Sequence, residues 1–499
     1  MSDQERAPIW EAMLEYRKRR MNRFHVPGHK GGEGLDDDAE VRELLQGVYG
    51  VDLTEIPGLD DLHQPEGVIA EAEQLAAECY GAQRTHFLIG GSTSGNLALI
   101  LSLCKPGDLL LVQRDAHKSV VNGLMLAGAR AVFLQPRIDP VSRLPGGLTL
   151  DTVEEALRLY PEAVGLLLTD PNYYGRGVDL RPIVQAAHAR AVPVVVDAAH
   201  GAHYGFHPAL PGGALQAGAD AVVHSTHKML TAMTMGAMLH MQGGLINQTA
   251  VARALRTIQS SSPSYPIMAS LDLARRQLAL RGTRLLGESV QVAMQAAEQL
   301  GSFKWLALHH TREPYSTQDP LKLVFADRTG TLSGFELMDE LAQCGCVAEM
   351  ADPEYVVLAL GMSTSEAEMH DLRNALESVA DKYQLNERMI NSGSWLAAGE
   401  SEAKVGAADG DATSGYSDPI AFQYHGESGE SVAVHLDDAV GYTAAELIVP
   451  YPPGVPLLYP GERIYDSHVI RLQAWLEAGS RIHGLRGDGT LVVRAADKH

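Results

Sequence analysis

A lysine and an aspartate in this chain each lie at the end of a short apolar run, where they could act on a bound ligand. Lys228 follows Ser225-Thr226-His227 directly beyond the run 221–224, and Asp197 ends the run 194–197. Such β-branched runs predict buried strands, and ligands in α/β proteins bind outside the carboxyl ends of the strands. A lysine amine there can form an imine with an aldehyde, and a carboxylate can hold a protonated ring nitrogen. The pairing predicts an enzyme that uses pyridoxal 5'-phosphate (PLP).

A glycine-rich and hydroxyl-rich loop precedes these residues. Residues 90–96 lie between a predicted strand and the helical run 97–103, and they include Ser92, Thr93 and Ser94. Backbone N–H groups and hydroxyls at a helix N-terminus bind anions. A glycine-rich turn with a capping hydroxyl would give the same pattern. Because Lys228 and Asp197 lie downstream, we interpret the loop as a phosphate site.

Two histidines complete the set of candidate catalytic residues. His117 follows the predicted strand 109–113, so it should face the same crevice and could stack on a cofactor ring, although a capping or surface histidine is the alternative. His227 adjoins Lys228 and could donate or shuttle protons. Taken alone, Lys228 would be interpreted as a surface lysine at the start of a helix, and its position after Ser225-Thr226-His227 and 31 residues beyond Asp197 reverses that preference.

The elements that must position these side chains alternate between apolar runs and helical patterns. Strands are predicted at 86–90, 109–113, 131–134, 164–169, 193–197 and 221–225. Strands separated by helices indicate an α/β fold with a mostly parallel, doubly wound sheet. A long helix is predicted at 267–300, and α+β structure after it.

Composition excludes several classes of protein. The 499 residues, 45% hydrophobic and 20% charged, are typical of a globular protein of two or three domains. A net charge of -22 disfavours nucleic acid and suits a cationic substrate. No signal peptide or membrane span is apparent, and Cys79, Cys104, Cys344 and Cys346 match no zinc or disulfide framework. We therefore expect a cytoplasmic protein with reduced, mostly structural thiols, no membrane contact and no metal.

The order of motifs along most of the chain resembles the Orn/Lys/Arg decarboxylase family of fold-type I PLP enzymes. Besides the loop at 90–96, the resemblance rests on segments 25–32 (HVPGHKGG), 52–62 (DLTEIPGLDDL), 115–119 (DAHKS), 197–201 (DAAHG), 225–228 (STHK) and 451–454 (YPPG). The chain begins almost directly with the first of these, so it is similar to the short, biosynthetic members, which are often specific for arginine.

The resemblance implies a role for each candidate residue. Lys228 becomes the Schiff-base lysine, Asp197 pairs with the ring nitrogen and His117 stacks on the ring. Cofactor contacts are expected from Ser92, Thr93, Ser94, His117, Asp197, Ala199, His200, Ser225, His227, Lys228 and, across a subunit interface, Ser261. The family builds its active sites between subunits, so a homodimer or higher homo-oligomer is expected. The substrate cation would need an acidic partner, for which the candidates are Glu55, Asp60, Asp61 and Glu446.

These expectations divide the chain into five parts. They are an N-terminal arm (1–50), a PLP-binding large domain (51–310), a small α+β domain (311–390), a linker poor in apolar periodicity (391–430) and a C-terminal decarboxylase domain (431–499).

The expected activity is PLP-dependent decarboxylation of a basic amino acid, with arginine favoured over lysine or ornithine. An aminotransferase or lyase on the same fold is one alternative, and a catalytically silent binding subunit is another. A metallohydrolase using Asp197, His200, His203 and His207 is the third, although Gly201 and Gly205 argue against a helix that would align those histidines.

Overall fold

A computed structural model describes the chain except for residues 1–2, 310–315, 390–414, 424–430, 452–453 and 496–499. The described residues form two compact units. The first contains Met1–Leu103 and Pro193–Leu286, and the second contains Cys104–Val192 and Gly287–His499.

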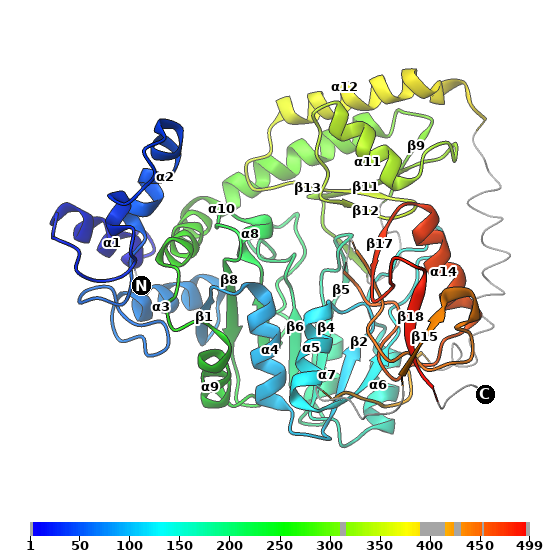
Figure 1. Ribbon diagram of the computed structural model, residues 1–499, viewed down its shortest axis with the longest axis horizontal. Coiled ribbons are helices and arrows are strands. Elements are labelled where there is room, and N and C mark those ends of the chain that lie inside the picture. Colours follow the sequence, from blue (N-terminus) through cyan, green and yellow to red (C-terminus); the bar gives the residue numbers. More distant parts are fainter. Residues whose placement is uncertain (1–2, 310–315, 390–414, 424–430, 452–453, 496–499) are drawn as a thin grey trace. The chain divides into compact units, whose positions relative to one another are not determined.

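Four buried strands form the sheet of the first unit, in the order β1 (Arg84–Leu88), β8 (Ala237–Met241), β7 (Ala221–His224) and β6 (Val194–Asp197). Strands β6 and β7 are parallel, with Asp197 opposite Val223, whereas β8 is antiparallel to both β7 and β1. Helix α4 (Gly91–Leu103) packs on this sheet, with α9 (Gln248–Ile258) beside it (Figure 1). The short helix α8 (Thr226–Met229) follows β7, so Lys228 lies just beyond a carboxyl end.

A glycine sets how closely α4 approaches the sheet. A Cβ at Gly95 would lie 2.8 Å from Cδ1 of Leu88 and 3.0 Å from Cγ1 of Val223. Both side chains are buried, so neither can move aside without disturbing the core. Gly95 therefore allows the N-terminal turn of α4, which carries the hydroxyl loop, to rest directly on β1 and β7.

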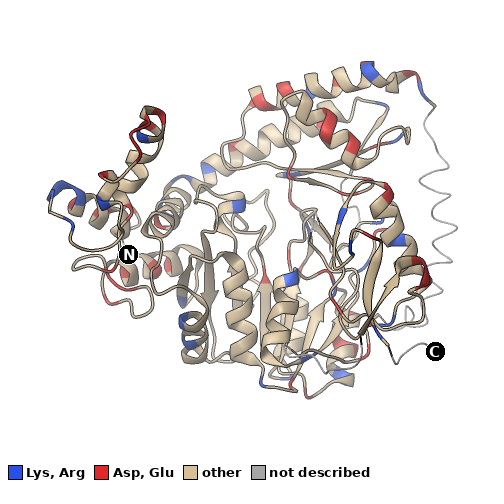
Figure 2. Cartoon of the chain, in the orientation of Figure 1, with Lys and Arg blue, Asp and Glu red and all other residues tan. Residues whose placement is uncertain are grey.

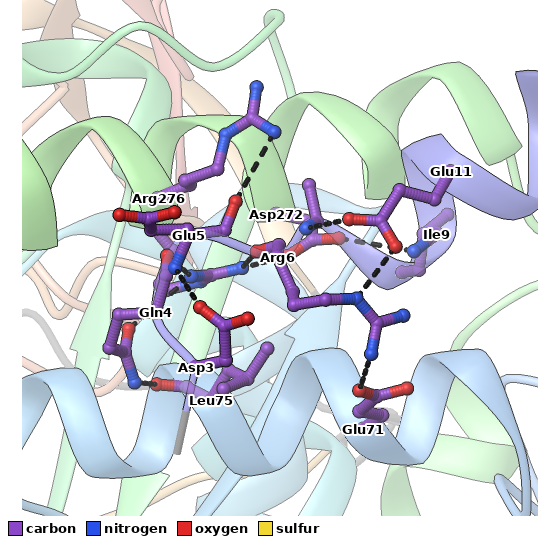
Figure 3. A network of polar contacts seen from close by, with 12 residues as sticks. Asp3, Gln4, Glu5, Arg6, Ile9, Glu11, Glu71, Leu75, Asp272 and Arg276 are labelled. Carbon is purple, nitrogen blue, oxygen red and sulfur yellow. Dashed lines mark hydrogen bonds and ion pairs between the residues drawn. The ribbon is translucent and has the colours of Figure 1, made fainter. Parts of the chain in front are cut away.

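The N-terminal segment of the first unit is held by a network of polar contacts on α10 (Tyr265–Leu300) and α3 (Val68–Tyr80) (Figure 3). The Arg275 guanidinium donates to the carbonyls of Gln4 (2.9 Å) and Arg6 (2.6 Å) and to the fully buried carboxylate of Asp272 (2.5 Å). Asp272 also accepts the N–H of Ile9 (3.1 Å). These contacts anchor the start of α1 (Pro8–Lys18), which is followed by the turn η1 (Lys30–Gly32) and α2 (Ala39–Val51).

The second unit contains its own group of parallel strands. Strand β2 (Leu109–Gln113) pairs in parallel with β3 (Arg130–Leu134) and β4 (Gly165–Thr169). The helices of this part are α5 (Lys118–Ala127), α6 (Leu150–Leu159) and α7 (Leu180–His188). A two-residue strand, β14 (Ile420–Ala421), adds to β3 in the antiparallel direction.

Smaller sheets make up the rest of the second unit. Four antiparallel strands run in the order β12 (Met350–Ala351), β13 (Val356–Ala359), β11 (Lys322–Asp327) and β9 (Leu306–Leu308), and they carry α11 (Gly334–Gln343) and α12 (Glu366–Tyr383) (Figure 1). Strand β10 (Ser316–Gln318) pairs with β5 (Arg176–Val178). The last part contains two strand pairs, β15 (Ser431–His435) with β18 (Thr490–Arg494) and β16 (Val449–Tyr451) with β17 (Arg481–His483), together with α14 (Asp466–Glu477). The short turns are η2 (Leu385–Glu387) and η3 (Leu436–Asp438).

The predicted α/β class and all six predicted strands are confirmed to within two residues, as is the long helix. The linker expected at 391–430 differs at residues 415–423, where β14 pairs with β3 and Ser417 Oγ accepts the N–H of Phe133 (2.9 Å). The remainder of that predicted linker lies outside the described residues. Among the helices that the structure describes, none is long and apolar enough to cross a bilayer.

Candidate active site

Lys228 is half-buried in the first unit, one turn beyond the end of β7. Its Nζ lies 3.0 Å from Nε2 of His200, which follows the end of the neighbouring strand β6. The His200 side chain is 4% exposed. The parallel register of β6 and β7 therefore brings together two residues that are 28 positions apart in the sequence.

Asp197 ends β6 and is held by two donors. The side-chain amide of Asn96 donates to Oδ2 (2.7 Å), and the N–H of Ala199 donates to Oδ1 (3.1 Å). Asp197 is 3% exposed, so these hydrogen bonds offset the cost of burying a carboxylate. Sequence reasoning assigned no role to Asn96. Its position one helical turn after Ser92, on the buried face of α4, is the signal that could have identified it.

The hydroxyl groups predicted to bind phosphate are partly brought together. Ser225 Oγ donates to Ser92 Oγ (2.7 Å), so the N-cap of α8 meets the first turn of α4. Thr93 is exposed. Ser94 is buried, and its hydroxyl donates to the carbonyl of Gly91 (2.8 Å), which is a contact within its own helical turn. Ser92 and Ser225 are therefore the best-placed hydroxyls, and the contact predicted for Ser94 stays a prediction.

The donors and acceptors in the first unit fit the chemistry of PLP. A buried carboxylate suits a pyridinium N–H, an amine suits the aldehyde carbon, and paired hydroxyls at the N-terminal turn of α4 suit a phosphate. Asp197, Lys228, Ser92 and Ser225 are the residues that would hold these three parts.

His227 points its ring toward the chain that leads into β8. The carbonyl of Gly236 accepts from Nδ1 (3.0 Å) and from the His227 backbone N–H (3.2 Å). A carbonyl only accepts, so the hydrogen bond assigns the proton of the neutral ring to Nδ1. Nε2 then carries the lone pair that general acid–base chemistry needs.

His117 belongs to the second unit, where it caps α5. Its Nδ1 accepts the N–H of Ser119 (3.2 Å) and lies 2.8 Å from the Ser119 hydroxyl. The capping role that the sequence left open is thus observed, and stacking on the cofactor stays a prediction. A Cβ at Gly454, in the segment 451–454, would lie 4.0 Å from Cδ2 of His117. Lys118 Nζ lies 5.2 Å from the centre of the Tyr451 ring. Tyr451 and Gly454, the described residues of the C-terminal motif, therefore lie beside the start of α5.

Ser261 lies in an exposed segment between α9 and α10. The neighbouring Ser260 carbonyl lies 2.9 Å from Nε2 of His63. A phosphate contact from Ser261 would come from another subunit, so it stays a prediction.

Asp60, a candidate acidic partner for the cationic side chain of the substrate, stabilises the start of a helix. Its carboxylate accepts the backbone N–H groups of Glu66 (3.0 Å), Gly67 (2.8 Å) and Ile69 (2.9 Å), and so caps α3. Burial opposes ionisation, but these donors hold the pKa of Asp60 below its ordinary value. Glu55, which accepts the Thr54 hydroxyl (2.6 Å), has no such role in the contacts described.

The metallohydrolase alternative finds no support in the geometry. His200 contacts Lys228, and His203 is fully buried with its ring against Tyr204 (4.9 Å between centres). Within the part of the chain that the structure describes, no three His, Cys, Asp or Glu side chains are arranged to hold a metal ion.

Buried histidines form the interior next to the site. The ring centre of His224, on β7, lies 5.0 Å from the ring centre of His240, on β8, and both rings lie against the ring of Tyr80. Burial lowers the pKa of His224 to about 3, with a smaller contribution from His203. Burial likewise lowers the pKa of His86 to about 3 and that of His240 well below 6.5. These rings are therefore neutral at physiological pH, so β7 and its neighbour β8 carry uncharged rings in the interior of the sheet.

The sequence pattern of the Orn/Lys/Arg decarboxylase major domain matches residues 7–371, and that of the family's C-terminal domain matches residues 418–487. The chain belongs to the Orn/Lys/Arg decarboxylase family. Membership confirms the resemblance stated from the motifs, and it identifies a PLP-dependent decarboxylase.

Relatives in this family match the chain over nearly its full length. It is 37% identical to Uncharacterized protein YaaO of Bacillus subtilis (strain 168), with 96% of each chain covered. It is 34% identical to a protein named Arginine decarboxylase from Halalkalibacterium halodurans, with 100% of this chain and 99% of the relative covered. The solved constitutive lysine decarboxylase of Escherichia coli has a TM-score of 0.78 at 21% identity, over 98% of this chain and 82% of that one. This likeness supports the fold-type I assignment.

Proposed function

We propose that this family member decarboxylates L-arginine to agmatine and CO2, with Lys228 as the catalytic lysine. The observation that carries the proposal is the contact between Lys228 Nζ and His200 Nε2 (3.0 Å), which lies between the ends of two parallel strands, where Asp197 and the paired hydroxyls also lie. An amine positioned beside an imidazole can exchange its proton, which the uncharged, reactive form requires.

When bound, PLP supplies an electron-accepting ring that stabilises negative charge at the substrate Cα after CO2 leaves. Asp197, fixed by Asn96 and Ala199, would keep the ring nitrogen protonated. Ser92 and Ser225 would hold the phosphate at the N-terminal turn of α4.

Proton transfer would fall to the residues around Lys228. Either the Lys228 ammonium or Nε2 of His227, after it has taken up a proton, would return a proton to the substrate Cα. His227 has its Nδ1 hydrogen directed at Gly236, which fixes the ring with Nε2 as the exchanging atom. His200 would hold the Lys228 amine in position.

Arginine is favoured by the relatives' names. Four relatives at 31–34% identity are named Arginine decarboxylase, whereas those named lysine decarboxylase are at 22–25% identity. The net charge of -22 suits any of the three basic substrates and does not separate them.

An assay of arginine, lysine and ornithine side by side tests the substrate. We expect agmatine from arginine, with kcat/KM at least about 100-fold above that for the other two, because a site built for a planar guanidinium leaves donors or acceptors unpaired around an ammonium. Cadaverine or putrescine as the main product would overturn the choice of arginine and leave the decarboxylase intact.

We also infer a homodimer, or a multiple of it, with active sites completed by a second copy. The N-terminal arm supports this inference, because it carries exposed apolar side chains, including Phe24 (93% exposed), Leu44 (69%) and Val26 (64%). Exposed apolar groups gathered on one segment are typical of protein contacts. A cytoplasmic location fits the four cysteines, all of which are free thiols.

A further inference from the structure

Two cysteines flank a single glycine at the C-terminal end of α11, outside the catalytic unit. The N–H of Gly345 donates to the carbonyl of Ala342 (3.0 Å), and the N–H of Cys346 donates to that of Leu341 (2.9 Å). Gly345 has φ +85°. This double hydrogen bond around a left-handed residue is a Schellman motif, which folds the chain back on the helix that it ends.

The fold-back holds the two cysteines at the same end of the helix. Cys344 follows the last residue of α11, and the backbone N–H of Cys346 returns to the carbonyl of Leu341 in its last turn. One residue separates the two thiols along the chain. Burial, then Asp371 and then the Cys344 thiol raise the pKa of Cys346, so the two sulfurs are near enough to interact.

The four cysteines differ in accessibility. Cys344 is exposed, Cys346 and Cys79 are half-buried, and Cys104 is buried. Burial raises the pKa of both Cys79 and Cys104 to about 12, so these two thiols are unreactive. The expectation that the cysteines are mostly structural stays a prediction.

The surroundings of the pair are acidic. Burial, followed by the Asp371 carboxylate on α12, raises the pKa of the Cys346 thiol. Further acidic residues lie along α12, where Glu366, Glu368, Glu377 and Asp381 outnumber Arg373 and Lys382, and Figure 2 shows the red and blue segments of this helix. These charges attract a cationic reagent and repel an anionic one, whereas a neutral reagent is not repelled.

We propose that Cys344 and Cys346 are a redox site that closes reversibly into an intramolecular disulfide by exchange with a low-molecular-weight disulfide, RSSR. The exposed Cys344 thiolate attacks one sulfur of RSSR, and RS⁻ leaves and takes up a proton. Cys346 then loses its proton and attacks the Cys344 sulfur, releasing a second RSH. Two cysteine thiols are oxidised and one RSSR is reduced to two RSH. A disulfide across a single residue closes a strained ring, so thiols reopen it readily.

Oxidation of the full-length holoenzyme with cystamine, followed by alkylation and peptide mass spectrometry, tests the site. We expect the peptide that contains both cysteines to lose about 2 Da, the mass of two thiol hydrogens, and to regain it with dithiothreitol. Cys79 and Cys104 serve as internal controls and should stay alkylated. Stable mixed disulfides on both thiols, no reaction, or equal oxidation of all four cysteines would each overturn the proposal.

Three variants sharpen the test. Cys346→Ser should stop at a cystamine adduct on Cys344, because the second thiol is missing. Cys344→Ser should react more slowly, because the remaining thiol is half-buried beside Asp371. Asp371→Asn should reduce the preference for cationic cystamine over an anionic disulfide. An unchanged preference, or a closed disulfide in either cysteine variant, would contradict the assignment.

Discussion

Asp197 relies on Asn96 as well as on its own strand. The Asn96 amide donates to Oδ2, while the N–H of Ala199 serves Oδ1, so each carboxylate oxygen has a protein donor. Hydrogen bonds to a charged group contribute about 1.5–3 kcal/mol each. Asn96 is therefore a positioning residue that acts through Asp197.

Asn96→Leu should lower kcat/KM by about 10- to 100-fold, the equivalent of one hydrogen bond to a charged group. Because Asp197 loses a donor that positions it, cofactor binding should also weaken. Steady-state kinetics and a titration with PLP measure both effects. A lower rate with unchanged cofactor affinity would contradict the positioning role, and Asn96→Gln, which keeps an amide, should restore part of the activity.

The buried histidine His224 makes the stability of the fold depend on pH in a defined direction. Its pKa is about 3 in the fold, against 6.5 as the ordinary value. Below pH 6.5 the unfolded chain therefore binds a proton that the folded chain does not, and stability is lost as the pH falls. Buried acids act in the opposite direction, as Glu73 does, whose pKa burial raises to about 8. Comparing the unmodified chain with a variant that lacks His224 separates the contribution of this histidine from those of the buried acids.

Lowering the pH from 7.5 to 5.5 should destabilise the unmodified chain more than His224→Leu, because the variant lacks one group that must stay neutral in the fold. The difference in unfolding free energy between the two proteins should therefore shift by about 1.4 kcal/mol in favour of the variant. Urea unfolding at both pH values gives the difference. A difference that does not change with pH would refute the buried neutral state.

At the scale of secondary structure, the close packing of α4 decides where the hydroxyl loop lies. Gly95→Ala places a methyl group 2.8 Å from Leu88, so we expect a loss of about 1–3 kcal/mol in stability and weaker cofactor binding. Gly47, inside α2 with nothing within 4 Å of its Cβ position, is the control: Gly47→Ala should stabilise by up to about 1 kcal/mol. Thermal unfolding and cofactor titration measure both variants. Equal effects would argue against the close approach.

The central strands and α10 could be predicted because their apolar runs and helical periodicity are local properties of the sequence. Strand β8, with His240 on it, was missed because its sequence, Ala-Met-Leu-His-Met, contains no β-branched residue. Residues 420–421 were expected in a linker, since a two-residue strand has no periodicity and depends on its partner β3.

The candidate site was predicted as a set of residues but not as a set of contacts. The order of Ser92, Asp197 and Lys228 along the chain was sufficient to indicate PLP. The hydrogen bond between Asn96 and Asp197 joins residues 101 positions apart, and the hydrogen bonds by which Asp60 caps α3 reach up to 10 positions along the chain. Neither contact therefore follows from a local sequence pattern. Both depend on how helices pack against strands and loops.

For the whole molecule, the N-terminal arm is the expected contact with a second copy. Phe24→Asp combined with Leu44→Asp should shift the protein toward monomers and lower activity, because charged groups cannot be buried in an apolar contact without large cost. Sedimentation velocity measures the shift. Val141→Asp, at a 74% exposed position in the second unit, is the control and should leave the assembly unchanged. Monomers that retain full activity would contradict shared active sites.

The most direct test of the decarboxylase assignment is the release of labelled CO2 from carboxyl-labelled arginine by the PLP-loaded enzyme, with no keto acid present. We expect CO2 and agmatine in equal amounts, and a loss of activity of at least about 1000-fold in Lys228→Ala, which should keep its fold by circular dichroism. Turnover that strictly requires a keto-acid acceptor, or CO2 release that survives in Lys228→Ala, would contradict it.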